Sequence, residues 1–113
     1  MVKEYIPKQG DIIYVNFNPT KGHEQKGMRP AIVISTNVFN KNTKMVIVCP
    51  ITSNTKDFPT HHLLTGSKII FGSVLCEHIR SIDYESRTIR FIEKASEKDL
   101  INIIMLVNAC IEE

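Results

Sequence analysis

Short apolar and alternating segments, separated by turn-forming residues, make up most of this chain and limit it to a small β fold. Residues 11–17 alternate, with Ile13 and Val15 on one face of a strand and Ile12 and Tyr14 on the other. Further strands are predicted where apolar or mixed runs end at Pro, Gly, Asn or Ser, at residues 31–35, 44–51, 73–82 and 87–93, with an edge strand at 60–65.

The last segment has the pattern of a helix. Ser96 followed by Asp99 resembles a capping box with Asp in place of Glu, and an apolar stripe follows over residues 100–111. The stripe consists of Leu100, Ile104, Val107 and Ile111, and it is widened by Ile101, Ile103, Met105 and Leu106. A helix this apolar around its circumference usually has two neighbours, here its own barrel and either a partner chain or more of the same chain. Short strands and one terminal helix predict a small, strongly curved antiparallel barrel.

Composition leaves the class of partner open. The chain has 113 residues, 42% hydrophobic and 23% charged, which fits one globular domain over residues 1–113. Its net charge is only +2, so nucleic-acid binding requires a local cluster of Lys and Arg. We see no signal peptide and no apolar run long enough for a membrane span. The widely spaced Cys49, Cys76 and Cys110 predict buried free thiols in a reducing, cytoplasmic compartment.

One stretch of the sequence carries a long and specific motif. Residues 10–31 read GDIIYVNFNPTKGHEQKGMRPA, and two further stretches read VCPITS at 48–53 and EHIRSID at 77–83. They resemble MazF/PemK/Kid toxins, whose pattern is G-D followed by apolar residues, a P-x-x-G-x-E-Q-x-G-x-R-P loop and an apolar strand. The resemblance extends over nearly the whole chain. It implies an SH3-like barrel with a C-terminal helix, a fold also used by the gyrase-directed CcdB toxins, so fold alone does not decide function.

The resemblance implies a metal-independent endoribonuclease with no cofactor. RNA carries its own nucleophile, the 2′-hydroxyl, so the protein must move two protons and stabilise charge on the phosphorane oxygens. The products would be a 2′,3′-cyclic phosphate and a 5′-hydroxyl. Arg29 is the first candidate for the phosphate because its planar fork suits bidentate contact. Arg is a poor proton acceptor, so we assign it charge stabilisation or donation to the leaving group.

Thr52 and Glu24 complete the expected catalytic set. Thr52 follows Pro50-Ile51 at a strand end, where its hydroxyl can donate to a phosphoryl oxygen or bond its own backbone. Glu24 lies in the motif loop and can act as the base, position bases and Arg29, or be an ordinary solvated carboxylate.

Substrate binding is predicted for basic and polar residues in the matching segments. Single-stranded RNA suits them because phosphates supply affinity and unstacked bases supply sequence choice. The predicted RNA-binding residues are Lys21, His23, Gln25, Lys26, Ser53, Lys56, His78 and Arg80. His23 and His78 depart from the family, which often has Ser and an amide at these positions. Phe58 either stacks on a base or, as we expect, packs against the barrel.

Histidines do not indicate a metal site. His61 and His62 are neighbours, and neighbours on a strand face opposite ways, so they do not readily share one ion. His78 and His23 have the intrinsic chemistry for proton transfer, but a structural or RNA-stacking role is favoured.

The leading hypothesis is a type II toxin that cuts mRNA as a homodimer. A MazE/PemI-like antitoxin would lay an extended acidic segment across the basic groove, at or near the dimer interface. The alternatives are a CcdB-like gyrase poison and a non-catalytic RNA-binding module.

Overall fold

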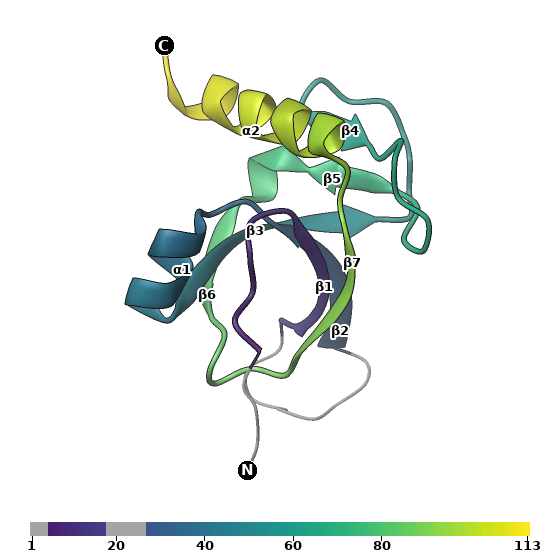
Figure 1. Ribbon diagram of the computed structural model, residues 1–113. Helices are drawn as coiled ribbons and strands as arrows, with labels where there is room; N and C mark the ends of the chain where they lie inside the picture. Colours follow the sequence, from purple (N-terminus) through teal and green to yellow (C-terminus); the bar gives the residue numbers. More distant parts are fainter. Residues whose placement is uncertain (1–4, 18–26) are drawn as a thin grey trace.

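Seven strands and two α-helices form the part of the chain that the computed structural model describes, residues 5–17 and 27–113 (Figure 1). In chain order the elements are β1 (Asp11–Asn16), β2 (Met28–Val33), α1 (Asn37–Thr43), β3 (Met45–Thr52), β4 (His61–Leu63), β5 (Ser73–Leu75), the 3-10 helix η2 (Cys76–His78), β6 (Arg80–Asp83), β7 (Ile89–Lys94) and α2 (Glu97–Ile111). None of the helices in these residues is long and apolar enough to cross a bilayer.

The sheet is antiparallel and strongly curved, as predicted. Its strand order is β4-β5-β3-β2-β1-β7, and β6 also pairs with β3. Viewed as in Figure 1, β1, β2, β3, β6 and β7 surround a central core, and α2 lies across one end beside β4 and η2. Among the described strands β6 and β7 do not pair, so the barrel is open there. The predicted fold class, a small antiparallel barrel with a C-terminal helix, is confirmed.

Two core clusters lie on opposite faces of the sheet. Ile13 and Val15 belong to one cluster, with Ala31, Val33, Val46, Val48 and Ile82. Ile12 and Tyr14 face the other cluster, which α2 covers with Ile103 and Val107. The two faces predicted for β1 are therefore confirmed. Because alternate residues of a strand face opposite ways, this single strand separates the two cores.

One continuous strand at 73–82 was predicted, and this is wrong. The segment divides into β5, η2 and β6 because both strands pair with β3. Val48 lies opposite Arg80, whereas Ile51 lies opposite Val74, so three steps along β3 correspond to six steps along the other segment. The turn of η2 takes up the difference.

Helix α1 was not predicted from the sequence. Its N-cap is Thr36, whose hydroxyl accepts from the backbone N–H of Phe39 at 3.2 Å. The segment is rich in Asn, which is a weak helix former. Tertiary contacts hold it instead, because the buried Asn40 amide donates to the Pro7 carbonyl at 2.9 Å and Tyr84 donates to the Asn40 carbonyl at 2.9 Å.

Helix α2 begins at the predicted cap, and its buried face differs in part from the predicted stripe. Ser96 Oγ accepts from the backbone N–H of Asp99 at 3.1 Å. Ile103 and Val107 are buried, whereas Ile111 is 67% exposed, so the predicted stripe is wrong at its end. The prediction of three buried thiols is also corrected: Cys49 and Cys76 are buried, but Cys110 on α2 is exposed.

Asp99 has a different role from the one its capping-box position suggests. Its buried carboxylate accepts from the backbone N–H groups of Thr65 at 3.2 Å and Gly66 at 2.9 Å, and it lies 2.8 Å from Nε2 of His62. Burial by itself raises the pKa of Asp99, but the hydrogen bonds from His62, Gly66 and Thr65 outweigh it and lower the pKa to about 2. The carboxylate thus fastens the segment after β4 to α2.

This lowered pKa predicts a loss of stability in acid. Because the folded-state pKa of Asp99 lies below the ordinary 3.8, its contribution is present above about pH 4 and is lost as the pH falls toward 2. The shift corresponds to about 2 kcal/mol of unfolding free energy. We expect Asp99→Asn to lower stability by roughly this amount at pH 7 and to flatten its pH dependence between 4 and 2. Urea unfolding measures both quantities.

The control is Glu97→Gln, an exposed acid in the first turn of the same helix. It should leave the unfolding free energy nearly unchanged. An Asp99→Asn protein with the acid sensitivity of the original chain would contradict the assignment.

Candidate functional site

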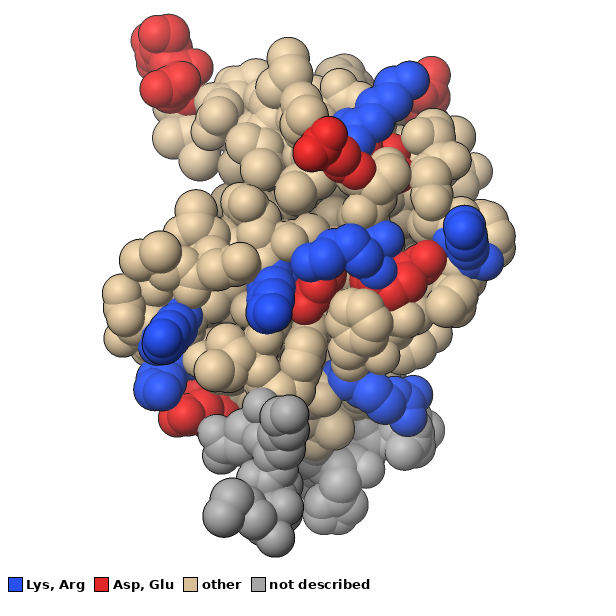
Figure 2. All heavy atoms as spheres, in the orientation of Figure 1, with Lys and Arg blue, Asp and Glu red and all other residues tan. Residues whose placement is uncertain are grey.

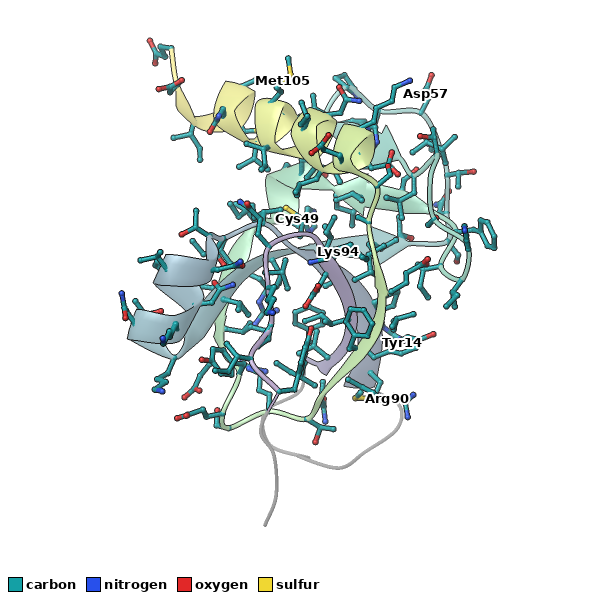
Figure 3. All side chains as sticks on the ribbon, in the orientation of Figure 1. Tyr14, Cys49, Asp57, Arg90, Lys94 and Met105 are labelled. Atoms are coloured by element: carbon teal, nitrogen blue, oxygen red, sulfur yellow. The ribbon has the colours of Figure 1, made fainter. Side chains whose placement is uncertain are left out.

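A cleft of about 820 Å³ opens where β1 and β3 end and β2 begins. Basic, hydroxyl and apolar side chains line it. They are Tyr14, Phe17, Arg29, Pro30, Pro50, Ile51, Thr52, Ser53, Ile69, Ile70, Phe71, Leu75, His78 and Arg80. Tyr14 is labelled in Figure 3, beside Arg90, whose guanidinium carbon is 5.7 Å from the centroid of the Tyr14 ring. Arg29, Thr52, Ser53, His78 and Arg80 were predicted as site residues, and the structure brings all five to this one cleft.

Strand alternation explains how these side chains meet. Arg29 precedes Ala31 by two residues, Thr52 follows Val48 by four, and Arg80 precedes Ile82 by two. Ala31, Val48 and Ile82 all belong to one core cluster. Because residues an even number of positions apart share a face of a strand, Arg29, Thr52 and Arg80 continue that same face beyond the core. The cleft therefore lies beyond the end of this core, and Tyr14, Ile51 and Ile70 of the other cluster complete its lining.

The cleft is electropositive. Arg29 and Arg80 are both exposed, and no Asp or Glu is among the described residues that line the cleft. The guanidinium of Arg80 lies over the ring of Phe17, 4.7 Å from its centroid, which holds the cation at the cleft wall without neutralising it. Two such cations without a carboxylate between them suit an anionic ligand.

A second hollow of about 320 Å³ adjoins the cleft and shares Thr52, Leu75 and His78 with it. Lys56, another predicted RNA-binding residue, lines this hollow and not the cleft itself. Its remaining lining consists of Asn54, Phe58, His61 and Glu77.

Glu77 organises the second hollow. Thr60 Oγ1 donates to it at 2.6 Å, His61 Nε2 lies 3.0 Å away and His78 Nε2 lies 3.6 Å away. Burial tends to raise the pKa of Glu77, but the bonds from Thr60, its own backbone N–H and His61 lower it. The carboxylate is thus held as an anion beside His78, so the carboxylate restrains a side chain that reaches both hollows.

The side chains of His61, His62 and Phe58 each have defined neighbours. His61 contacts Glu77, whereas His62 contacts Asp99, so the two neighbours face apart as predicted. No group of three His, Cys, Asp or Glu side chains within residues 5–17 and 27–113 is arranged to hold a metal ion. Phe58 was expected to pack against the barrel, and this is wrong: it is 54% exposed, with its ring centroid 4.9 Å from that of His61.

Part of the predicted site lies outside the described residues. The proposed base or positioning residue Glu24 is among these, as are the predicted RNA-binding residues Lys21, His23, Gln25 and Lys26. Their roles stay predictions.

One wall of the cleft was not predicted from the sequence. Ile69, Ile70 and Phe71 belong to the segment joining β4 to β5, and all three line the cleft. The available signal was an apolar triplet between Gly66-Ser67 and Gly72-Ser73, in a region that otherwise has the composition of a loop.

The family of the chain follows from comparison with known sequences. A family model described as "PemK-like, MazF-like toxin of type II toxin-antitoxin system" matches residues 8–110. The chain belongs to this toxin family. The match spans every described element from β1 into α2, so it includes both strands that supply Arg29 and Thr52.

Characterised members of the family are similar over most of the chain. The endoribonuclease toxin MazF of Escherichia coli K12 is 40% identical over 87 residues, which cover 77% of this chain and 78% of that protein. The endoribonuclease toxin ChpB of the same organism is 32% identical, covering 99% of this chain and all of that protein. The crystal structure of MazF from Deinococcus radiodurans superposes with a TM-score of 0.84 at 33% identity, covering 97% and 100% of the two chains. A MazE–MazF complex from the same species gives a TM-score of 0.83 at 28% identity, covering 96% and 98%.

Gly72 lets the wall segment, Ile69 to Phe71, lie close to the end of β3 in this toxin. A Cβ atom at Gly72 would lie 2.2 Å from the carbonyl oxygen of Thr52, so a side chain there forces the backbone apart. We expect Gly72→Ala to cost about 1–3 kcal/mol of unfolding free energy, as overpacking typically does. Urea unfolding measures this loss. Thr55→Ala, at an exposed position of the loop after β3, should change little, and equal stability of the two variants would contradict the tight contact.

Proposed function

We propose that this chain is the toxin of a type II toxin–antitoxin system and cuts single-stranded RNA, chiefly mRNA, without a metal ion. The observation that carries the proposal is that Arg29 and Thr52, from different strands, line one cleft that no described carboxylate enters. The family assignment and the names of its characterised relatives support the same activity.

The cleavage uses the substrate's own nucleophile. The 2′-oxygen attacks phosphorus and loses its proton to a base, while the bond from phosphorus to the 5′-oxygen breaks and that oxygen takes up a proton. The products are a 2′,3′-cyclic phosphate and a 5′-hydroxyl. Arg29 stabilises the charge on the phosphorane oxygens and can serve the leaving group as donor, and the Thr52 hydroxyl donates to a phosphoryl oxygen. Glu24 is our candidate for the base or for positioning Arg29.

Substrate affinity comes from the surroundings of the cleft. Arg80 supplies a second cation beside Arg29, and Ser53 and His78 line the same space. Lys56 extends the positive surface into the adjoining hollow. Lys21, His23, Gln25 and Lys26 are proposed to contribute from the motif loop. Phosphate contacts of this kind supply much of the affinity for single strands and make it dependent on salt.

The proposed partners are an antitoxin of the MazE/PemI kind and a second copy of the chain. An acidic, extended antitoxin segment fits a cleft whose described charges are positive. The second copy would cover the open side of α2, where Ile101 is 52% and Met105 62% exposed. Met105 points away from the barrel in Figure 3, and the middle of α2 carries no charge in Figure 2. We further infer a cytoplasmic location, where mRNA and antitoxin are both present.

Arg29→Ala tests the catalytic assignment. Arg29 is exposed, so its removal should leave the fold intact. We expect the rate of RNA cleavage to fall by about 10²-fold or more, the usual cost of losing a group that stabilises developing charge. The assay incubates protein with a mixed RNA pool in EDTA and maps new 5′-hydroxyl ends. Lys41→Ala, an exposed cation on α1, is the control and should cut normally. Full activity of Arg29→Ala would remove Arg29 from the mechanism.

A 2′-deoxy residue at the scissile step tests the nucleophile. We expect no cleavage at that phosphate, because the attacking oxygen is missing, while the protein still binds the strand. Gel analysis of matched oligonucleotides with and without the substitution measures the effect. Equal cutting of both would show that another nucleophile acts. Inhibition of DNA supercoiling without RNA cuts would favour the gyrase-directed alternative, and RNA binding without cuts would favour the non-catalytic module.

A further inference from the structure

Two large apolar side chains stand out of the cleft wall into solvent. Ile69 is 60% exposed and Phe71 is 70% exposed, although both line the cleft that contains Arg29 and Thr52. Isolated exposed apolar residues are common on protein surfaces. These two lie on one short segment, on either side of Ile70, and share the cleft with Arg29 and Arg80, so they mark a candidate contact for a ligand.

The segment that carries them is held by two carboxylates. Glu93 of β7 accepts from the backbone N–H groups of Lys68, Ile69 and Ile70 at 2.9, 3.0 and 2.8 Å. Burial tends to raise the pKa of Glu93, but these three bonds lower it, so it acts as an anion. Asp99 holds Thr65 and Gly66 in the same way. The backbone of this segment is therefore fixed without any ligand.

Local packing then determines which side chains face the cleft opening. Ile70 is 8% exposed and belongs to the core cluster under α2, so it anchors the segment inward. Its neighbours Ile69 and Phe71 are largely exposed instead. The next residue, Gly72, allows the backbone to approach the carbonyl of Thr52, and the Gly72 carbonyl accepts from Leu64 N–H at 3.0 Å. The exposed pair therefore stands directly beside the strand end that carries Thr52.

We propose that Ile69 and Phe71 form a preformed apolar wall that takes one unpaired nucleobase of the RNA, next to the phosphate bound by Arg29 and Thr52. This inference rests on the proposed function and adds to it a base-binding residue pair. Its chemistry follows from the lining: a nucleotide is an anion joined to a flat apolar ring, and here cations and an apolar surface adjoin in one cleft. Aromatic side chains stack on bases of single strands, and an aliphatic neighbour supplies contact area.

A rigid wall makes this contact efficient. A loop that had to be ordered on binding would spend part of the interaction free energy on that ordering. The bonds to Glu93 and Asp99 have already ordered the backbone of this segment. Every base has a π face, so stacking does not require one particular base. The wall should therefore favour large bases over small ones without selecting a single base.

The experiment pairs protein variants with an RNA that lacks one base. A short RNA containing a single cut site is made intact and with an abasic residue at each position flanking the scissile phosphate. For the unaltered protein, one abasic position should reduce kcat/KM about tenfold, the size expected from one stacked base. Phe71→Ala alone, and together with Ile69→Ala, should cut the intact RNA about tenfold less well and lose most of the abasic penalty. Val38→Ala, at a residue of α1 that is 69% exposed, is the matched control and should keep the full penalty.

Binding is measured separately from cleavage. The intact and abasic RNAs are prepared with a 2′-deoxy residue at the scissile step, which blocks cutting, and Kd is determined by fluorescence anisotropy. We expect the abasic residue to raise Kd for the unaltered protein and to raise it much less for Phe71→Ala. Equal abasic penalties for the unaltered and Phe71→Ala proteins would overturn the wall. A Phe71→Ala protein that loses affinity for a protein partner but not for the RNA would overturn it as well. Absence of cutting by the unaltered protein would instead refute the proposed function, so the two failures are distinct.

Discussion

The pairing of β3 with two successive partners along one edge is the constraint on which the site depends. Its first half pairs with β6 and its end pairs with β5, in registers that differ by three residues. A single straight strand cannot satisfy both registers, so the chain turns through η2. That turn places Glu77 and His78 beside the end of β3 and sets Arg80 at the start of β6. The cleft is thus a consequence of how the sheet changes partner.

The charges of the molecule are distributed so that the cleft keeps its positive field. Glu93 and Asp99 face backbone N–H groups of the segment between β4 and β5, and Glu77 faces Thr60 and the histidines. Each carboxylate is held as an anion by hydrogen bonds that outweigh its burial. These bonds orient the acids toward the scaffold, and none of the three lines the cleft of Arg29 and Arg80. A low overall charge of +2 is therefore compatible with a locally cationic site.

The sequence predicted what depends on local periodicity and failed where long-range contacts decide. Alternation gave the two faces of β1, and the Ser96 cap gave the start of α2. The motif resemblance brought Arg29, Thr52, Ser53, His78 and Arg80 together, and they line one cleft. Helix α1 was missed because Asn40 and its tertiary bonds hold it, not helix propensity. The 73–82 strand was wrong because its interruption depends on register against β3, which no local pattern reveals. Neither does periodicity show that Cys110 and Phe58 are exposed.

The exposed apolar wall is compatible with a stable fold because its cost is met by other parts of the segment. Ile70 contributes burial to the core, and Glu93 accepts from three backbone N–H groups that would otherwise need water. Stability therefore does not depend on the Ile69 and Phe71 side chains, which are mostly outside the core. Residues at such positions can change without unfolding the barrel, whereas Gly72 and Glu93, which hold the backbone, cannot change so freely. In this arrangement Ile70 and Gly72, which hold the backbone, alternate with Ile69 and Phe71. Under our proposal, base preference can therefore vary at this pair while the proposed phosphate site of Arg29 and Thr52 stays fixed.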